Sequence, residues 1–301
     1  MNLKEYYNKN FDPYYGQLVD VCGNVKRVLA NNPSPFTYYG TGTYIVDDEE
    51  LAIIDPGPNI KSHINNLLRV ISKDTKVHIF ITHTHADHSP ATHILKEERE
   101  CITYGYGAYP FEKYDTKFEE GHDLEFKPDI SLKDGDKIKA KNWTIQAIHT
   151  PGHTSNHMCY GLEESSVLFT GDHIMGWATT VIIPPDGDME AYMNSLKKVL
   201  SYNYNVFLPT HGGPIKSPKK FVNALIGHRK MREQQIINEL FKNSLTINEM
   251  VSKFYKNTNK KLWPAAKKSI LATLISLEKK GIKCVDNSKE DNTKWVLIKK
   301  K

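Results

Sequence analysis

The sequence predicts an α/β fold followed by a small helical domain that ends in two strands. Pairs of strand-like runs alternate with helical segments up to about residue 215, which indicates two mixed sheets packed together with helices outside. Residues 216–301 carry 21 Lys and Arg but 7 Asp and Glu, a net charge of +14, whereas residues 1–215 carry a net charge of −9. We therefore expect two domains, 1–215 and 216–301.

The composition is that of a globular protein. The chain has 301 residues, of which 39% are hydrophobic and 25% are charged, and its net charge is +5. It contains no apolar stretch of about 18 residues, so we expect no membrane span. Its first residues lack the pattern of a secretory signal or a transit peptide. We expect a cytoplasmic protein whose four widely spaced cysteines are reduced core residues: Cys22, Cys101, Cys159 and Cys284.

Hydrophobic periodicity predicts the elements of the first domain. An alternating run predicts one strand over residues 17–29, and apolar side chains spaced i, i+3, i+4, i+7 predict a helix over 62–71. A helix over 187–202 has Asp188 at its N-cap. Further strands are expected at 42–46, 51–54, 77–81, 101–104, 137–140, 143–149, 158–161, 167–169 and 206–208, and a further helix at 89–96.

Two segments of the first domain have no clear period. Residues 106–126 mix aromatic and charged side chains, and we interpret them either as a loop beside the active site or as an irregular surface crossing. Residues 175–185 follow directly on a candidate ligand, Asp172, and are a candidate wall of a substrate cleft. Both segments could therefore contact a substrate.

The second domain has the pattern of helices followed by a two-stranded wing. Thr246 and Glu249 form a capping-box pattern at the start of one helix, and Gly281 ends another. Helices are expected at 218–243, from 245, and at 264–280, and strands at 282–285 and 294–298. Six lysines could contact phosphates or could form a solvated basic face: Lys260, Lys261, Lys267, Lys268, Lys279 and Lys280.

The residues with the clearest chemistry lie in the segment 82–88. It has the sequence Thr-His-Thr-His-Ala-Asp-His and follows the buried strand at 77–81. Neutral imidazole and carboxylate groups bind Zn²⁺, and a catalytic zinc needs three protein ligands. The segment contains four candidate ligands, one more than a single catalytic zinc needs, which suggests two metal ions. They are His83, His85, Asp87 and His88.

Other candidate ligands follow other predicted strands. His153 lies in a His-Thr-Pro-Gly-His-Thr segment, Asp172 in Thr-Gly-Asp-His, and His211 in Pro-Thr-His-Gly-Gly. In each segment a Pro or Gly breaks the strand beside a ligand-type residue. The sequence therefore predicts a metal site at the strand ends.

These segments, in this order, resemble the metallo-β-lactamase superfamily over residues 16–213. The resemblance implies an αββα sandwich that holds two zinc ions. One zinc would be bound by His83, His85 and His153. The other would be bound by Asp87, His88 and His211, with Asp172 bridging the two. Asp55 lies where the superfamily keeps an aspartate near the metal floor, and we expect it to support the ligand loop through hydrogen bonds rather than to bind a metal.

The segments 149–160, 175–188 and 262–267 resemble, more narrowly, the β-lactamase-like protein 2 subfamily. Its members join a metallo-β-lactamase domain to a small C-terminal winged-helix domain, and the animal members are similar to endoribonucleases that act on single-stranded RNA. The resemblance covers the chain from about residue 16 to its end.

The predicted site is that of a zinc-dependent hydrolase that uses a metal-bound hydroxide. Two zinc ions lower the pKa of bound water and can stabilise displacement at phosphorus or polarise a carbonyl. Asp87 would orient the hydroxide and accept its proton. His157 could bind a phosphate or carbonyl oxygen or lie behind the site, and His173 is expected behind it. The other histidines match no motif: His63, His78, His93, His122 and His228.

Three functions remain open at this point. The first is an endoribonuclease that acts on single-stranded RNA, which the basic second domain favours. The second is a hydrolase of a small thioester or lactone, like glyoxalase II. The third is a nucleic-acid-binding protein whose metals are structural. The oligomeric state is not predicted.

Overall fold

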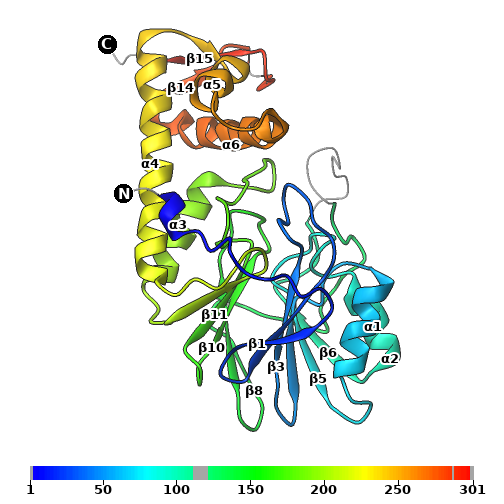
Figure 1. The fold of residues 1–301 in the computed structure, drawn as a ribbon. Coiled ribbons are helices and arrows are strands. Elements are labelled where there is room, and N and C mark those ends of the chain that lie inside the picture. Colours follow the sequence, from blue (N-terminus) through cyan, green and yellow to red (C-terminus); the bar gives the residue numbers. More distant parts are fainter. Residues whose placement is uncertain (1–2, 111–120, 287, 299–301) are drawn as a thin grey trace.

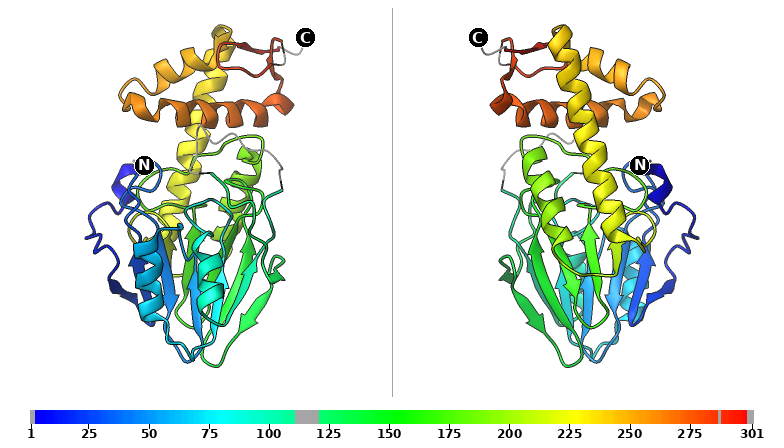
Figure 2. Two further views of the ribbon diagram at one scale, coloured as in Figure 1. Left: turned by 90° about the vertical axis from the view of Figure 1, so that its right-hand side faces the viewer. Right: turned by 90° about the vertical axis from the view of Figure 1, so that its left-hand side faces the viewer.

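The fold consists of two stacked sheets with helices on both outer faces, and a smaller unit beyond them (Figures 1 and 2). The structure is a computed structural model that describes residues 3–110, 121–286 and 288–298. Part of the irregular segment expected at 106–126 lies outside the described residues.

The first sheet contains seven strands in chain order, from β1 to β7. Strands β4, β5, β6 and β7 pair in parallel, and the strands before them pair antiparallel. Its strands are β1 (Leu18–Cys22), β2 (Val25–Leu29), β3 (Gly42–Val46), β4 (Leu51–Ile54), β5 (Val77–Phe80), β6 (Cys101–Gly105) and β7 (Ile130–Ser131).

The second sheet has five strands in the order β12-β11-β10-β9-β8. Only the β11–β12 pair is parallel, so the carboxyl ends of these two strands lie at the same edge. The strands are β8 (Lys137–Lys139), β9 (Thr144–His149), β10 (Met158–Leu162), β11 (Val167–Gly171) and β12 (Val206–Pro209).

Large aromatic side chains fill the space between the two sheets. Tyr44 and Phe80 from the first sheet pack with Trp143, Tyr160 and Phe169 on the side of the second sheet, and all five are buried. Aromatic and β-branched side chains stabilise strands because they pack across a pleated surface. Burial of these rings therefore favours both the strands and their stacking.

The helices cover the outer faces of the sheets, as expected of an αββα sandwich. α1 (Lys61–Val70) and α2 (Ala91–Glu98) lie on the first sheet, where Leu67 and Leu95 join its outer core. α3 (Met189–Leu200) and α4 (Pro218–Lys242) lie on the second sheet. Asp188 caps α3 by accepting a hydrogen bond from Ala191 N at 2.9 Å, as predicted.

The prediction of one strand over residues 17–29 was wrong. The chain turns at Gly23, and its two halves pair antiparallel as β1 and β2, with a bulge between Asp20 and Cys22. Gly23 has φ +55°, a conformation that glycine adopts without steric cost. The alternation of side chains continues through the turn and does not reveal it.

The smaller C-terminal unit has the predicted winged-helix shape. Strands β13 (Leu245–Thr246), β14 (Ile282–Cys284) and β15 (Lys294–Leu297) form a three-stranded sheet beside α5 (Ile247–Phe254) and α6 (Trp263–Ser276). Trp295 is fully buried in the core of this unit. α6 ends at Ser276 and a short 3₁₀ turn follows, so the helix is shorter than the predicted 264–280; Gly281, with φ +87°, ends the turn.

Helix α4 connects the two units. Its first half, with Phe221 and Leu225, packs in the outer core of the second sheet. Its second half, with Ile236 and Leu240, packs in the core of the C-terminal unit. One continuous helix therefore carries residues of both cores, and the domain boundary at residue 215 stays a prediction. Within the described ranges, no helix is both long and apolar enough to cross a membrane.

Replacing Thr246 by alanine is expected to destabilise the C-terminal unit by about 1 kcal/mol, because helix α5 loses its N-cap. Glu249 N donates to Thr246 Oγ1 at 3.1 Å, and Thr246 N donates to Glu249 Oε2 at 2.7 Å, which completes the predicted capping box. Urea denaturation of Thr246→Ala and of Thr246→Ser, which keeps the hydroxyl, would measure the loss. Equal destabilisation by both variants would contradict the role of the hydroxyl.

Candidate metal centre

All seven predicted ligands converge at one edge of the sandwich. The loop that follows β5 carries His83, His85, Asp87 and His88, and the remaining three ligands follow strands of the second sheet. His153 lies between β9 and β10, and Asp172 and His211 follow β11 and β12. The parallel pairing of β11 and β12 places the last two ligands side by side.

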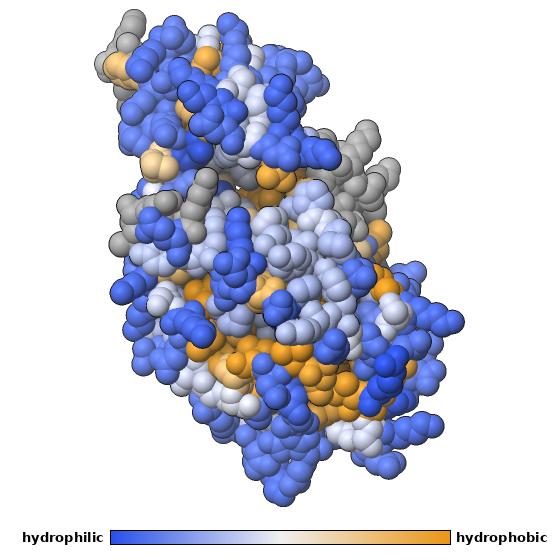
Figure 3. Space-filling view, viewed as in Figure 1, coloured by the Kyte–Doolittle hydropathy of each residue, from blue (hydrophilic) through white to orange (hydrophobic). Residues whose placement is uncertain are grey.

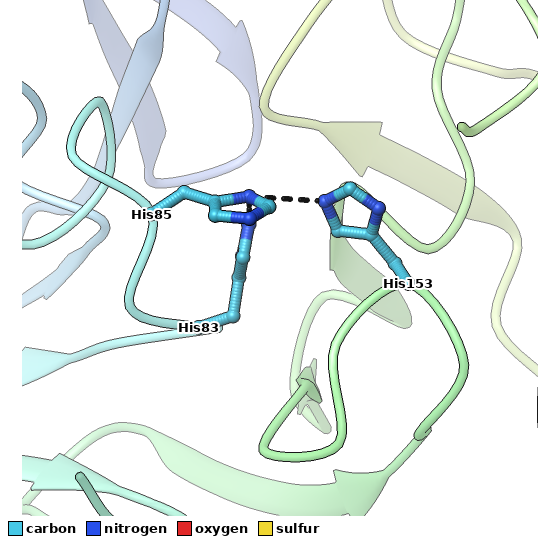
Figure 4. A group of neighbouring side chains, drawn as sticks. All are labelled: His83, His85 and His153. Atoms are coloured by element: carbon cyan, nitrogen blue, oxygen red, sulfur yellow. Dashed lines mark hydrogen bonds between the residues drawn. The ribbon is translucent and has the colours of Figure 1, made fainter. Parts of the chain in front are cut away.

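The first group of side chains contains three histidines. His83 Nε2 lies 2.8 Å from His85 Nδ1, and His153 Nε2 lies 3.1 Å from the same atom. Figure 4 shows the three imidazole rings pointing toward one another from the two loops. His83 Nδ1 bonds to Thr82 Oγ1 at 3.0 Å, and His153 Nδ1 donates to Val181 O at 2.8 Å. These outer hydrogen bonds direct the Nε2 atoms of His83 and His153 inward.

The second group contains Asp87, His88 and His211. Asp87 Oδ2 lies 3.1 Å from His211 Nε2 and 3.4 Å from His88 Nε2. His211 Nδ1 donates to Gly40 O at 3.1 Å, so its Nε2 faces the group. Thr41 Oγ1 donates to Asp87 Oδ2 at 3.1 Å and orients the carboxylate.

Asp172 lies between the two groups. Its Oδ1 is 3.3 Å from His211 Nε2 and 3.6 Å from His88 Nε2, and its Oδ2 is 3.8 Å from His153 Nε2. Within the described ranges, buried His88 Nε2 and Asp172 Oδ1 have no hydrogen-bond partner. Buried polar atoms without partners are costly. Inward-facing nitrogen and carboxylate atoms at such distances fit bound cations, so the residues present fit the metal ions that the fold implies.

Asp55 supports the ligand loop through hydrogen bonds, as expected. It is fully buried and accepts hydrogen bonds from Thr82 N at 2.8 Å and Thr82 Oγ1 at 2.7 Å. It also accepts from His88 Nδ1 at 2.8 Å and Thr210 Oγ1 at 3.1 Å. One carboxylate thus joins the segments that carry His83, His88 and His211.

The charges in the site perturb the pKa values of its residues. Burial opposes the charged form of His211, but the carboxylates of Asp172 and Asp87 raise its pKa to about 10. Burial also opposes the charge on His88, and Asp87, Asp55 and Asp172 raise its pKa well above the usual value. Burial and the adjacent imidazoles lower the pKa of His83 well below its usual value. In the protein without metal, the protonated imidazoles of His88 and His211 therefore balance the charge of the carboxylates, which bound cations would otherwise balance.

Two further histidines lie behind the ligands. His157 is fully buried; its Nε2 accepts from Asp172 N at 3.2 Å and from His173 N at 3.3 Å, and its Nδ1 donates to Thr150 Oγ1 at 2.9 Å. Both ring nitrogens are used, so His157 positions Asp172 rather than binding a substrate oxygen. Burial lowers the pKa of His173 to about 3, and its ring packs edge-on against Tyr192.

His122 also lies at the site, where the sequence did not predict it. The centre of its ring lies 4.4 Å from that of His85 and 3.7 Å from that of Tyr109, which stacks on it. Tyr106 stacks on His149 at 4.2 Å. Residues 121–123 therefore lie beside the loop that carries the candidate ligands, whereas Phe126 is buried in the outer core of the first sheet. His122 belongs to no motif, so no sequence signal could have located it there.

A cavity of about 220 Å³ adjoins the metal site. His85, His153 and His211 lie at its metal side, and helix α6 of the C-terminal unit forms part of its wall. Apolar side chains line much of it: Phe36, Met175, Trp177, Val181, Leu262 and Ala265. Figure 3 shows hydrophobic surface at the notch below the C-terminal unit. The first part of the segment 175–185, up to Val181, lines the cavity, as expected of a cleft wall, whereas Ile182 is buried in the core.

A second set of residues that sequence analysis missed lines the same cavity. His228, Arg229 and Arg232 project into it from helix α4. Their spacing places His228 and Arg232 one turn apart on one helix face, which is the signal that could have grouped them. The candidate phosphate ligands predicted in the second domain were all lysines.

Two stacked sheets with His and Asp side chains gathered at their strand ends place the protein in the class of metal-dependent hydrolases. The model of the metallo-beta-lactamase superfamily matches residues 37–211, and that of the beta-lactamase associated winged helix domain matches residues 246–295. The chain belongs to the metallo-β-lactamase superfamily and has the domain composition of its β-lactamase-like protein 2 members.

Several relatives cover much of the chain. Beta-lactamase-like protein 2 homologs of Drosophila melanogaster and Caenorhabditis elegans are each 31% identical over 90% of this chain, and the matches cover 93% and 89% of those proteins. An atrochrysone carboxyl ACP thioesterase of Aspergillus fumigatus is 32% identical over 73% of this chain and 66% of that protein.

Two solved structures have the same fold. A beta-lactamase domain protein from Burkholderia ambifaria superimposes with a TM-score of 0.80, at 16% identity, over 98% of both chains. A metallo-beta-lactamase family protein from Thermus thermophilus superimposes with a TM-score of 0.73, at 16% identity, over 91% of this chain and 99% of that one. At this identity the likeness concerns the fold, including the position of the C-terminal unit.

Proposed function

We propose that the site binds two zinc ions. His83, His85 and His153 would bind the first, and Asp87, His88 and His211 the second. Asp172 would bridge them, since its Oδ1 faces His88 and His211 while its Oδ2 faces His153. Five imidazoles and two carboxylates are a donor set that suits zinc. Measurement of two zinc ions per chain by mass spectrometry would support the assignment, and a single bound ion would contradict it.

The residues around the metals would have different roles in hydrolysis. Bound zinc would supply Lewis acidity and an activated water near neutral pH. Asp87 would orient the attacking water and accept its proton, because its carboxylate both joins the second group and lines the cavity. His157 would keep Asp172 in place through the two backbone N–H groups that it accepts from.

We propose that the substrate is an acyl thioester or ester. The observation that carries this proposal is the apolar cavity beside the metal site, whose lining includes Phe36, Met175, Trp177 and Leu262. Transfer of an acyl chain from water into this cavity would lower the free energy. The carbonyl group of the same substrate would then lie at the metals. The relatives of this chain include proteins named as ACP thioesterases, which supports the proposal.

Cleavage of single-stranded RNA is the second candidate. The observation that favours it is the net charge of +14 on residues 216–301. However, three of the lysines considered as phosphate ligands pair with carboxylates: Lys267 with Asp291, Lys279 with Glu190 and Lys280 with Glu233. These pairs reduce the charge that is available to RNA, so we place the acyl substrate first.

Assays of two substrates with the same protein preparation would test the proposal. We expect zinc-loaded protein to hydrolyse S-hexanoyl-N-acetylcysteamine, a neutral thioester, and to lose this activity after treatment with a chelator. A labelled single-stranded RNA would be tested with the same preparation. Cleavage of the RNA without hydrolysis of the thioester would reject the acyl substrate and favour the second candidate.

Zinc binding at pH 7.5 is expected to release about two protons. In the metal-free protein the pKa of His211 is about 10 and that of His88 lies well above its usual value, so both imidazoles are protonated. Zinc binds neutral imidazole, so both protons must leave, and the apparent affinity rises with pH until these groups lose their protons. Calorimetric titration in buffers of different ionisation enthalpy would count the protons.

The variants His211→Gln and His93→Gln provide the comparison for this titration. His211→Gln should release about one proton fewer than the parent protein. His93 lies outside the ligand set, so His93→Gln should release as many protons as the parent protein. Zinc binding without proton release would contradict the predicted protonation of the metal-free site.

A further inference from the structure

Two arginines of helix α4 lie in the cavity beside the metal site, and among the residues that the structure describes they have no carboxylate partner. Arg229 and Arg232 line the same cavity as the ligands His85, Asp87 and Asp172. Within the described residues neither forms an ion pair, although the lysines nearby do: Lys279 pairs with Glu190, and Lys280 with Glu233. The two guanidinium groups are therefore a source of positive charge inside a largely apolar cavity.

Aromatic rings and single hydrogen bonds hold both side chains in place. The Arg229 guanidinium lies 5.2 Å from the centre of the Tyr192 ring, and its Nη2 donates to Thr180 O at 2.5 Å. The Arg232 guanidinium lies 4.4 Å from the centre of the Tyr255 ring, and its Nη1 donates to Gln235 Oε1 at 2.9 Å. Groups fixed in this way lose little conformational entropy when they bind a ligand.

Each arginine also keeps a buried donor unused. The Nε atoms of Arg229 and Arg232 are buried and have no hydrogen-bond acceptor within the described ranges. Burial of a charged donor without a partner is costly, and an anion that enters the cavity would remove this cost. The positive charges also affect the neighbouring His228. Its pKa is lowered to about 4, mainly by burial and also by the charges of Arg229 and Arg232.

We propose that Arg229 and Arg232 form an anion-binding subsite for a carboxylate or phosphate group of the substrate. The proposal rests on the proposed acyl hydrolase activity and specifies its substrate class: an acyl ester or thioester with an anionic group at the far end of its apolar chain. The fork of N–H groups on arginine matches both anions, and the apolar side chains that line the same cavity match the chain.

The test compares substrates that differ only in the terminal group. Zinc-loaded protein would be given p-nitrophenyl hexanoate, mono-p-nitrophenyl adipate and the corresponding ester with a terminal phosphonate. We expect kcat/KM to be about tenfold higher for an anionic ester than for the hexanoate, mainly through a lower KM. The better of the two anionic esters identifies the anion.

The variants Arg229→Gln and Arg232→Gln are each expected to lower the ratio of anionic to neutral kcat/KM about tenfold. Lys230→Gln removes one exposed positive charge from the same helix and should leave the ratio at the parent value. Arg232→Lys, which keeps the charge but not the fork, should restore part of it. An equal ratio in the parent protein and both arginine variants would overturn the proposal.

A binding measurement separates failure of this proposal from failure of the proposed function. If no ester is hydrolysed, the acyl hydrolase proposal fails, and calorimetric titration of zinc-loaded protein with adipate and with inorganic phosphate tests the subsite alone. Binding of either anion that weakens about tenfold in Arg229→Gln and Arg232→Gln, but not in Lys230→Gln, would support the subsite. Binding that is the same in all variants would overturn it.

Discussion

Replacing Asp87 by alanine is expected to lower kcat for ester or thioester hydrolysis by about 10²–10⁴-fold, the range for loss of a general base. Asp87 Oδ2 lies within 3.4 Å of both His88 Nε2 and His211 Nε2, and the residue also lines the cavity. The variant loses a proton acceptor at the reacting water and one metal-binding carboxylate. Steady-state kinetics and zinc content, measured on the same preparation, would separate these two losses.

The control for Asp87 is Asp74→Ala, which removes an exposed carboxylate far from the ligand set. Asp74→Ala should have the activity and zinc content of the parent protein. Asp87→Asn keeps the size of the side chain but not its charge, and should be nearly as inactive as Asp87→Ala. Full activity of either Asp87 variant would show that another group accepts the proton.

Replacing Asp55 by alanine is expected to destabilise the metal-free protein by about 3–5 kcal/mol, the cost of breaking a buried charged pair. Asp55 accepts four hydrogen bonds from the segments that carry the ligands, two of them from Thr82 and the others from His88 Nδ1 and Thr210 Oγ1. Without it, buried donors lose their acceptor and His88 loses a carboxylate that stabilises its charge. Urea denaturation of the chelated protein would measure the difference.

Zinc affinity of the Asp55→Ala variant should also fall, by about 10–100-fold, because the support of a ligand histidine is lost. Asp55→Asn keeps one acceptor oxygen and should lose less of both quantities. A normal urea midpoint together with normal zinc affinity would contradict the supporting role of Asp55.

The elements and most of the site could be predicted because their signals are local in the chain. A buried strand followed at once by Thr82–His88 predicts ligands at a strand end, and the structure places them after β5. The capping box of Thr246 and Glu249 predicts the start of α5. In each case, side chains a few residues apart determine the geometry, so tertiary contacts did not have to be known.

Other features could not be predicted because their partners are distant in the sequence. His122 contacts His85 across 37 positions, and neither residue indicates the other. The hairpin of β1 and β2 was missed because the positive φ of Gly23 interrupts a strand pattern that continues on both sides. Backbone turns and long-range ring contacts do not change the apolar period that sequence analysis relies on.

By itself the sequence indicated the layered α/β class, candidate metal ligands at the strand ends and a basic C-terminal unit, because these follow from local periodicity, ligand chemistry and charge. The division of the ligands between two metal ions came from the resemblance to a known family and stays a prediction. Only the tertiary structure decided which residues surround the metals. It places Arg229 and Arg232 of α4 and Leu262 beside ligands that precede them by more than 15 residues, and pairs several lysines with carboxylates. The physical reason is that a cavity is formed where separate elements pack, and its lining depends on their relative positions rather than on any one segment.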